Sequence, residues 1–134
     1  MDSAKKILKK KIGYSLIFTA IILISAFFRF LFLGKIPVSL NWDEVAIGYN
    51  SFSILETGKD EFGVKFPLFL RSFGDYKSAI PSYLSIPFIK FFGLNELAIR
   101  LPTAILSVSA VAACFFLVKN LSGDVYLSLL SAFL

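Results

Sequence analysis

IGYSLIFTAIILISAFFRFLFL, residues 12–33, is an apolar run with the length of a membrane helix. Residues 12–28 contain no charged side chain, and Arg29 can reach the far interface through its long aliphatic stem. At 1.5 Å per residue, roughly 20 residues cross a hydrocarbon core of about 30 Å. A cleaved signal peptide is the rival interpretation, but its apolar core usually has about 7–15 residues and precedes a small-x-small site. Because this core is longer and has no clear site, residues 12–33 are expected to form a first membrane helix.

Five lysines stand directly before this run: Lys5, Lys6, Lys9, Lys10 and Lys11. A basic cluster can bind nucleic acid, but the chain contains no recognisable nucleic-acid-binding module, so no nucleic-acid partner is expected. Anionic lipid headgroups attract such a cluster, and positively charged flanks stay on the cytoplasmic side of a membrane. Residues 1–11 are therefore predicted to be a cytoplasmic basic tail, with membrane lipids as partners.

Two more apolar runs complete the predicted membrane topology. Residues 101–118 predict a second membrane helix ending at the cytoplasmic side, and residues 125–134 predict the start of a third, truncated one. Residues 34–100 then form an extracytoplasmic loop. Hydrophobic residues make up 57% of the chain and the mean hydropathy is +0.77, which is typical of a chain that needs lipid or a large partner. We expect an all-α fold, a polytopic helix bundle in the cell membrane, with residues 1–134 as its N-terminal fragment.

The loop between the first two membrane helices carries signals for short helices and turns. Apolar residues at helical spacing predict a helix over residues 45–55, with Asn41 or Asp43 as N-cap and Gly58 as its stop. Residues 81–92 are apolar but too short to span, which favours a juxtamembrane helix on the bilayer surface or against sister helices. Phe-Gly pairs predict turns at residues 62–63, 73–74 and 92–93.

Two residue types that often carry chemistry are nearly missing. Histidine is absent, and Cys114 is the single cysteine. Within this chain, that excludes an internal disulfide, a thiolate metal cage, histidine-based zinc sites, and Ser-His-Asp or Cys-His catalysis. Cys114 lies inside the second apolar run, which favours a packing role.

The acidic pair Asp43 and Glu44 follows the first membrane helix closely. Carboxylates in the first turn of a helix gain about 0.3–1 kcal/mol from the helix dipole, and Asn41 three residues before Glu44 resembles a capping box. That local role is a sufficient explanation for the pair on its own. A functional role becomes attractive because basic residues are predicted at the same membrane face.

These basic residues are Lys77, which follows Tyr76, and Arg100 at the entrance of the second membrane helix. Each could contact lipid headgroups or pair with a nearby acid, Asp75 or Glu96. Together with carboxylates they fit the transfer of a sugar from a polyprenyl phosphate to a hydroxyl group. That reaction needs a base beside the attacking oxygen and positive charge around the leaving phosphate.

Several short motifs then fall in a familiar order. They are Trp42-Asp43-Glu44, Gly48, Thr57-Gly58, Tyr76-Lys77, Pro81 with Tyr83, Phe92-Gly93-Leu94-Asn95-Glu96, and Arg100-Leu101-Pro102. In this order, residues 15–134 resemble the N-terminal region of the polyprenyl-phosphate-sugar-dependent membrane glycosyltransferases typified by protein O-mannosyltransferases and bacterial aminoarabinose transferase. The mannosyltransferase branch tends to have His-Pro-Pro where this chain has Ala79-Ile80-Pro81, which favours the bacterial-type branch.

The resemblance implies a GT-C architecture with juxtamembrane helices, a polyprenyl-phosphate-linked sugar as donor, and catalysis on the outer face. It implies that Asp43 is the base or organises the acceptor, that Glu44 is its catalytic partner, and that Lys77, with Tyr76 and Arg100, binds the donor phosphate. Later helices of such enzymes supply further donor-binding residues, so this fragment is expected to be inactive alone. The sugar and the acceptor, whether lipid, glycan or protein, are not specified.

Two alternatives stay open at this point. A non-enzymatic polytopic scaffold or transport component would use the same charges as interfacial anchors, and a stop codon directly after Leu134 would favour it. An oligosaccharyltransferase-like relative would also place an aspartate early in its first outer loop, but would need a divalent metal. The sequence contains no dedicated metal motif, and it leaves metal assistance open.

Overall fold

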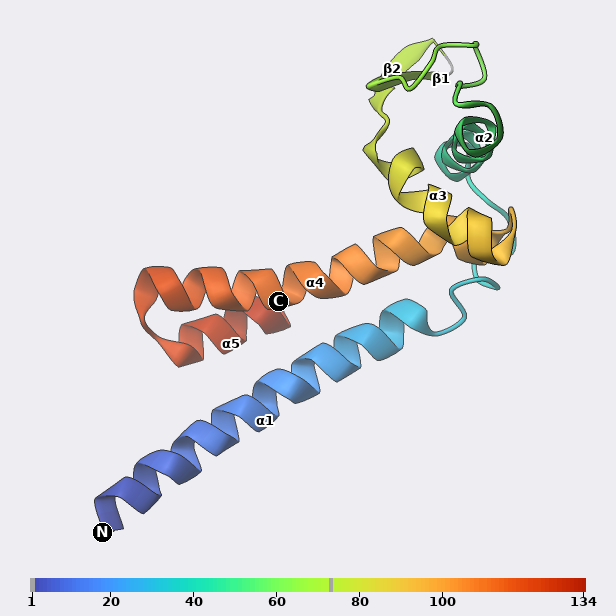
Figure 1. Cartoon of the computed structure of the whole chain (residues 1–134). Coiled ribbons are helices and arrows are strands. Elements are labelled where there is room, and N and C mark those ends of the chain that lie inside the picture. The colour runs from blue at the N-terminus through green and yellow to red at the C-terminus, as the bar shows by residue number, and fades with distance from the viewer. Residues whose placement is uncertain (1, 73) are drawn as a thin grey trace. The chain divides into compact units, whose positions relative to one another are not determined.

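The computed structural model describes residues 2–72 and 74–134 (Figure 1). The elements are α1 (Asp2–Phe30), α2 (Trp42–Thr57), β1 (Phe69–Ser72), β2 (Asp75–Ser78), α3 (Ile80–Phe92), α4 (Glu96–Ser122) and α5 (Val125–Phe133). The chain divides into two compact units. The helical unit comprises the chain up to Leu31 together with Leu106–Leu134, and the loop unit comprises Phe32–Ile105.

Within the described residues, two helices are long and apolar enough to cross a membrane: Lys9–Phe30, of 22 residues, and Glu96–Ser122, of 27 residues. At 1.5 Å per residue the shorter one extends for about 33 Å, which matches a hydrocarbon core. The expected first helix, residues 12–33, differs at both ends, since α1 starts at Asp2 and stops at Phe30. Lysine is a good helix former, so the basic tail continues the helix toward the N-terminus.

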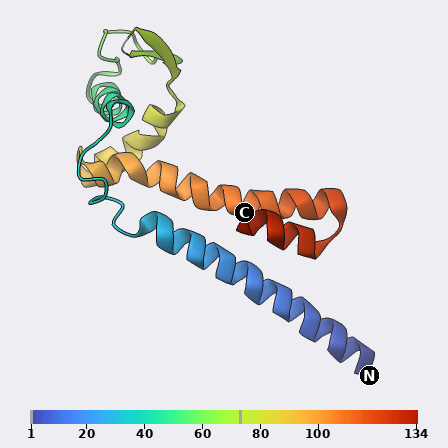
Figure 2. The same cartoon turned by 180° about the vertical axis from the view of Figure 1, so that it is seen from behind.

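Aromatic and aliphatic side chains hold the helical unit together. Phe115, Leu129 and Ala132 form its buried cluster, and Phe18 of α1 packs on Phe115 with ring centroids 4.2 Å apart. After α4 the chain reverses at Gly123, whose φ of 69° suits glycine, and both cartoon views show α5 running back beside α4 (Figure 2).

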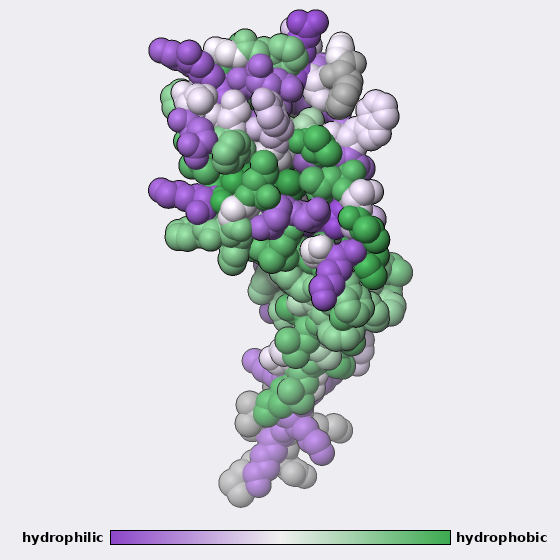
Figure 3. Space-filling view, turned by 90° about the vertical axis from the view of Figure 1, so that its right-hand side faces the viewer, coloured by the Kyte–Doolittle hydropathy of each residue, from purple (hydrophilic) through white to green (hydrophobic). Residues whose placement is uncertain are grey.

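The outer surface of α1 is apolar rather than polar. No residue from Lys9 to Phe30 is buried, and Leu16, Leu23 and Phe28 are each more than 60% exposed. In the space-filling view, hydrophobic side chains cover most of the visible face of the helical unit, and hydrophilic ones gather at the N-terminal end of α1 (Figure 3). An apolar surface of this extent needs a covering of lipid or protein, which agrees with membrane association.

In the loop unit, α2 is fixed at both ends by local hydrogen bonds. The side chain of Asn41 accepts the Glu44 N–H at 2.8 Å, and the Glu44 carboxylate accepts the Asn41 N–H at 3.0 Å. These two hydrogen bonds form a capping box, so the capping box expected from Asn41 and Glu44 in the sequence is confirmed. At the other end Gly58 adopts a φ of 70° and donates its N–H to the Ile54 carbonyl, as expected for the helix stop.

The described residues are mostly helical, as expected, but a two-stranded antiparallel hairpin, β1–β2, departs from the all-α expectation. The turn was predicted at residues 73–74, and Gly74 has a φ of 86°, but Phe73 lies outside the described residues. The strands were missed because four residues each are too few to establish an alternating pattern. Leu70 pairs with Lys77 across the hairpin, and Arg71 pairs with Tyr76. Successive side chains of a strand point to opposite faces, so Lys77 shares a face with Leu70, and Tyr76 lies on the other face.

Small residues let α2 approach its neighbours closely. Ser51 and Ser82 are fully buried between α2 and α3, and the Ser51 hydroxyl donates to the Ser82 carbonyl at 2.9 Å. A Cβ atom added to Gly48 would lie 2.5 Å from Ile99 Cδ1, in the first turn of α4. Residues 80–92 thus form a helix packed against another helix, which is one of the two placements that the sequence allowed.

Candidate active site

Consecutive carboxylates at the start of α2 have different partners. One residue of a helix turns the chain by roughly 100°, so Asp43 and Glu44 cannot face the same way. Glu44 faces Arg100 in the first turn of α4, and Asp43 faces Lys77 on β2. All four residues belong to the loop unit. Four of the five predicted site residues are therefore brought together as two ion pairs.

Glu44 and Arg100 form a bidentate salt bridge. Arg100 Nε donates to Glu44 Oε1 at 2.8 Å, and Nη2 donates to Oε2 at 3.1 Å. The guanidinium also donates to three backbone carbonyls of the segment before α2, those of Leu33, Pro37 and Ser39, at 3.0–3.1 Å. An arginine has five N–H groups, and these contacts use all five.

Arg100 therefore has a structural role in this conformation. Its side chain is 7% exposed, and it ties α2 and the segment of residues 33–39 to the start of α4. The sequence-based assignment of Arg100 to phosphate binding is not supported by this geometry, because no N–H group remains for a phosphate. The nearby Glu96 is a possible partner of Arg100 by sequence, whereas the ion pair in the structure is with Glu44.

The Glu44 carboxylate is likewise held by hydrogen bonds. Both of its oxygens accept hydrogen bonds, from Arg100 and from the Asn41 N–H. The hydrogen bond from Arg100, opposed in part by desolvation and aided by the Asn41 N–H, holds the pKa of the Glu44 carboxyl below its ordinary value. Glu44 is thus kept ionised and oriented, which suits a positioning residue better than a group that accepts protons during turnover.

Asp43 and Lys77 form the second, more open pair. Lys77 Nζ donates to Asp43 Oδ1, and the side chains are 40% and 62% exposed, respectively. An ammonium group has three N–H donors and a carboxylate has two oxygens, so both groups keep capacity for a ligand. The residues are 34 positions apart in the chain, and only the fold of the hairpin over α2 makes them neighbours.

This open pair stands at a cavity of about 240 Å³. Besides Asp43 and Lys77, its walls include Ile47 and Asn50 of α2 and Leu70 of β1. The walls are mainly apolar with a few polar groups, which is the usual character of a small-molecule site. An acid and a cation beside such a cavity form the part of the loop unit best suited to chemistry.

Tyr76 is not part of this arrangement. It is 68% exposed and pairs across the hairpin with Arg71, on the face opposite Lys77. Its phenol does not line the cavity of the Asp43–Lys77 pair. Neighbouring residues of a strand point to opposite faces, so recognition of the strand in the sequence would have shown that Tyr76 and Lys77 point apart.

A second cavity, of about 380 Å³, adjoins the first and was not foreseen. It is lined by Tyr49 and Phe62 among others, and it shares Ala46 and Ser72 with the Asp43–Lys77 cavity. The helical spacing of residues 43, 46 and 49 could have indicated a common face of α2. Ser72 offered no such signal, because its position depends on the unrecognised strand.

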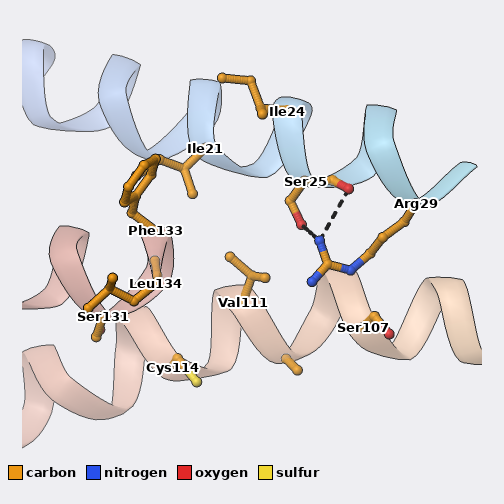
Figure 4. A pocket seen from close by; sticks show the side chains of 12 residues that line it. Ile21, Ile24, Ser25, Arg29, Ser107, Val111, Cys114, Ser131, Phe133 and Leu134 are labelled. Carbon is orange, nitrogen blue, oxygen red and sulfur yellow. Dashed lines mark hydrogen bonds between the residues drawn. The ribbon is translucent and has the colours of Figure 1, made fainter. Parts of the chain in front are cut away.

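The helical unit contains a cavity of its own, of about 400 Å³ (Figure 4). Among the described residues that line it, Arg29 carries the charge, and it donates to the hydroxyl of Ser25 at 2.5 Å and to the Ser25 carbonyl at 3.3 Å. The guanidinium thus reaches along its own helix. Among the described residues of the whole chain, no three His, Cys, Asp or Glu side chains converge as metal ligands.

No family model, curated protein or solved structure matches this chain. The functional proposal therefore rests on the site geometry and on the order of motifs in the sequence.

Proposed function

We propose that this chain is the part of a membrane glycosyltransferase that holds the catalytic base. The enzyme transfers a sugar from a polyprenyl-phosphate donor to a hydroxyl acceptor at the outer face of the cell membrane. The observation that carries the proposal is the pairing of Asp43 with Lys77 at the mouth of the 240 Å³ cavity. The order of sequence motifs, which resembles the GT-C glycosyltransferases, supports it.

The membrane topology follows from the positive-inside rule. The lysines before the first span place the N-terminus in the cytoplasm. One crossing by the span within α1 then brings the loop unit outside, and the span within α4 leads back to Lys119. This arrangement places Asp43 and Lys77 where a polyprenyl carrier can present its sugar outside the cytoplasm.

The division of labour follows from the charges. Lys77 binds the phosphate of the donor through its free N–H groups, and positive charge there stabilises the negative charge that develops on the leaving phosphate. Asp43 accepts the proton of the acceptor hydroxyl through the oxygen that Lys77 does not use. Glu44 and Arg100 fix the first turn of α2, and so they position Asp43 without touching the reactants.

The transfer is a single displacement. The acceptor oxygen forms a bond to the anomeric carbon of the sugar, the bond from that carbon to the phosphate oxygen breaks, and its electron pair stays on the phosphate. The acceptor proton moves to Asp43 and from there to solvent. The products are the new glycoside and the polyprenyl phosphate.

Substitution of Asp43 tests the proposal most directly. Asp43→Asn keeps the shape of the side chain and removes its capacity as a base, so transfer should fall by about 10²-fold or more. The reaction is measured in the full-length protein in lipid nanodiscs with a polyprenyl-phosphate sugar. Asp75→Asn is the matched control, because Asp75 is exposed on the hairpin and lines neither cavity.

The rival of a non-enzymatic scaffold makes the opposite prediction. Under it, no sugar transfer is detected with the wild-type protein, and Asp43→Asn alters only the ion pair with Lys77. Turnover by Asp43→Asn at the wild-type rate would remove Asp43 from the mechanism.

A further inference from the structure

The cavity lined by Tyr49 and Phe62 has the side chains of a carbohydrate-binding site, which we call the seat. It is about 380 Å³ in volume, and its walls are Val45, Ala46, Tyr49, Glu61, Phe62 and Ser72. It combines two aromatic rings, one carboxylate and two hydroxyl groups, those of Tyr49 and Ser72. These groups come from α2, from the loop after it and from β1, so the hairpin fold is needed to assemble them.

Ser72 is the first sign that a ligand belongs here. The residue is 4% exposed, and its hydroxyl has no hydrogen-bond partner among the described residues. A buried hydroxyl without a partner destabilises a fold, so such a group in a cavity wall is explained when a ligand supplies the partner. Ser72 lines this cavity and also the cavity beside Asp43 and Lys77.

Two aromatic rings supply the second sign. Tyr49 and Phe62 are each 55% exposed although they line the cavity. The face of an aromatic ring is negative, so it attracts the slightly positive C–H groups on one side of a sugar ring. Arg71 lies over the Phe62 ring, 5.4 Å from its centroid, and this contact holds the ring in place.

Glu61 supplies the polar contact that a sugar requires. Its Oε1 accepts the side-chain amide of Asn50 at 3.0 Å, and its backbone N–H donates to Asn50 Oδ1 at 3.1 Å. Asn50 is 1% exposed, so this reciprocal pair anchors the carboxylate to the buried side of α2. Within the described residues no bond to Glu61 Oε2 is seen, and this oxygen can accept a sugar hydroxyl.

We propose that this cavity seats the sugar ring of the acceptor, so that the acceptor of the transferase is a carbohydrate. The inference rests on the proposed function, with Asp43 as base. Ala46 follows Asp43 by three residues, and side chains at that spacing are roughly 5–6 Å apart on one helix face. A ring held by Tyr49 and Phe62 therefore directs a hydroxyl across the small Ala46 side chain to Asp43.

The chemistry of the walls distinguishes a carbohydrate from other acceptors. A lipid tail would leave Glu61 and Ser72 without partners. An extended peptide would need backbone donors and acceptors along the cavity, whereas the groups offered here are side chains. A pyranose has one apolar face for the rings and hydroxyl groups at its edge for Ser72 and Glu61, so it uses every group present.

Saturation-transfer NMR on the full-length protein in nanodiscs tests the seat. The probes are the methyl glycosides of glucose, galactose and mannose at millimolar concentration, with a blocked Gly-Ser-Gly peptide for comparison. We expect saturation transfer to the ring C–H protons of at least one glycoside and none to the peptide. Tyr49→Leu and Phe62→Leu keep apolar bulk and should weaken binding by up to about tenfold.

Matched variants separate the seat from general effects of substitution. Phe69→Leu removes another exposed ring, 65% exposed and on the opposite face of β1, and should bind glycosides as the wild type does. Ser72→Ala should weaken binding while leaving the protein folded, as checked by the melting curve of Trp42 fluorescence. Asp43→Asn should keep glycoside binding and lose transfer.

The outcomes separate this inference from the proposed function. Glycoside binding that is unchanged in Tyr49→Leu and Phe62→Leu would overturn the seat, as would wild-type protein that binds no glycoside or binds the peptide instead. Binding at the seat without any transfer from a polyprenyl-phosphate sugar would overturn the proposed function and leave a carbohydrate-binding site. Sugar transfer without glycoside binding at Tyr49 and Phe62 would overturn the seat and leave the proposed function standing.

Discussion

The two sides of the first turn of α2 differ more than their sequence suggests. On one side Glu44 faces Arg100, which is 7% exposed and donates all five of its N–H groups within the loop unit. On the other side the Asp43 and Lys77 side chains are 62% and 40% exposed beside a cavity. The two acids are consecutive in the sequence and each forms an ion pair with a basic residue. Only the Asp43–Lys77 pair keeps free donors and acceptors for a ligand.

The contrast shows that charge pairing alone does not identify a functional site. A pair with a buried arginine whose donors are all used holds elements together, and loss of the arginine leaves a partly buried carboxylate without its partner. An exposed pair contributes little to stability, about 0–1 kcal/mol, and its groups can exchange partners. We therefore assign Glu44 and Arg100 to positioning and Asp43 and Lys77 to the proposed reaction, and each assignment can be broken by experiment.

The largest effect is expected for Arg100→Ala. It leaves Glu44 and three backbone carbonyls without their donor, so the free energy of unfolding of the loop unit should fall by about 3–5 kcal/mol. Trp42, the single tryptophan and the first residue of α2, reports the transition by fluorescence. Arg100→Lys should rescue little, because an ammonium cannot reproduce the fork.

Lys77→Ala is the comparison that makes this result informative. It should change the free energy of unfolding by less than about 1 kcal/mol, since the pair with Asp43 is exposed. If Lys77→Ala destabilised the loop unit as strongly as Arg100→Ala, the distinction between the two sides of α2 would be lost.

The next effect concerns the donor. A hydrogen bond to a charged group contributes about 1.5–3 kcal/mol, so Lys77→Ala should raise the KM for the polyprenyl-phosphate sugar roughly tenfold or more. The KM for the acceptor should stay near its wild-type value. Lys90→Ala, which removes an exposed lysine from α3, serves as control in the same steady-state assay. Equal changes in both KM values would return Lys77 to a structural role.

Comparison of the wild type with Glu44→Gln in a pH titration of stability isolates the Glu44–Arg100 pair. Arg100 lowers the pKa of Glu44 in the folded state below its unfolded value of about 4.3. Stability from this group is therefore complete above about pH 4.3 and is lost as the pH falls through the folded pKa. The wild type should lose stability in that acidic range more steeply than Glu44→Gln.

Glu56→Gln is the matched variant for this titration. Glu56 is an exposed carboxylate of the same helix and forms no ion pair in the described part of the chain. The free energy of unfolding of this variant is followed over the same acidic range. A Glu44→Gln slope equal to that of the wild type would mean that the pair with Arg100 adds no pH-dependent stability.

Much of this arrangement could be anticipated from local sequence, and the rest depends on contacts between distant residues. The caps of α2 at Asn41 and Gly58 follow from the chemistry of a few neighbouring residues, and so the sequence predicts them well. The partner of Arg100 could not be chosen between the nearby Glu96 and the distant Glu44. The hairpin escaped detection, and with it the opposite orientations of Tyr76 and Lys77.

The smallest effect separates two buried serines. Ser82 donates to the Ile47 carbonyl at 3.3 Å, so Ser82→Ala should destabilise the loop unit by about 1 kcal/mol. Ser72 is also buried but has no partner among the described residues, so Ser72→Ala should leave stability unchanged or raise it by roughly 1 kcal/mol. Both variants are compared in the same Trp42 melting experiment.

The sign of the Ser72→Ala effect matters because it links stability to the cavity. The Ser72 side chain already borders open space, so loss of its hydroxyl adds little new void inside packed structure. A gain in stability would mean that the fold tolerates an unpaired hydroxyl at a cost, which is typical of groups retained for a ligand. A loss like that of Ser82→Ala would mean that Ser72 already has a partner in solution, and the open side of α2 would then resemble the saturated side.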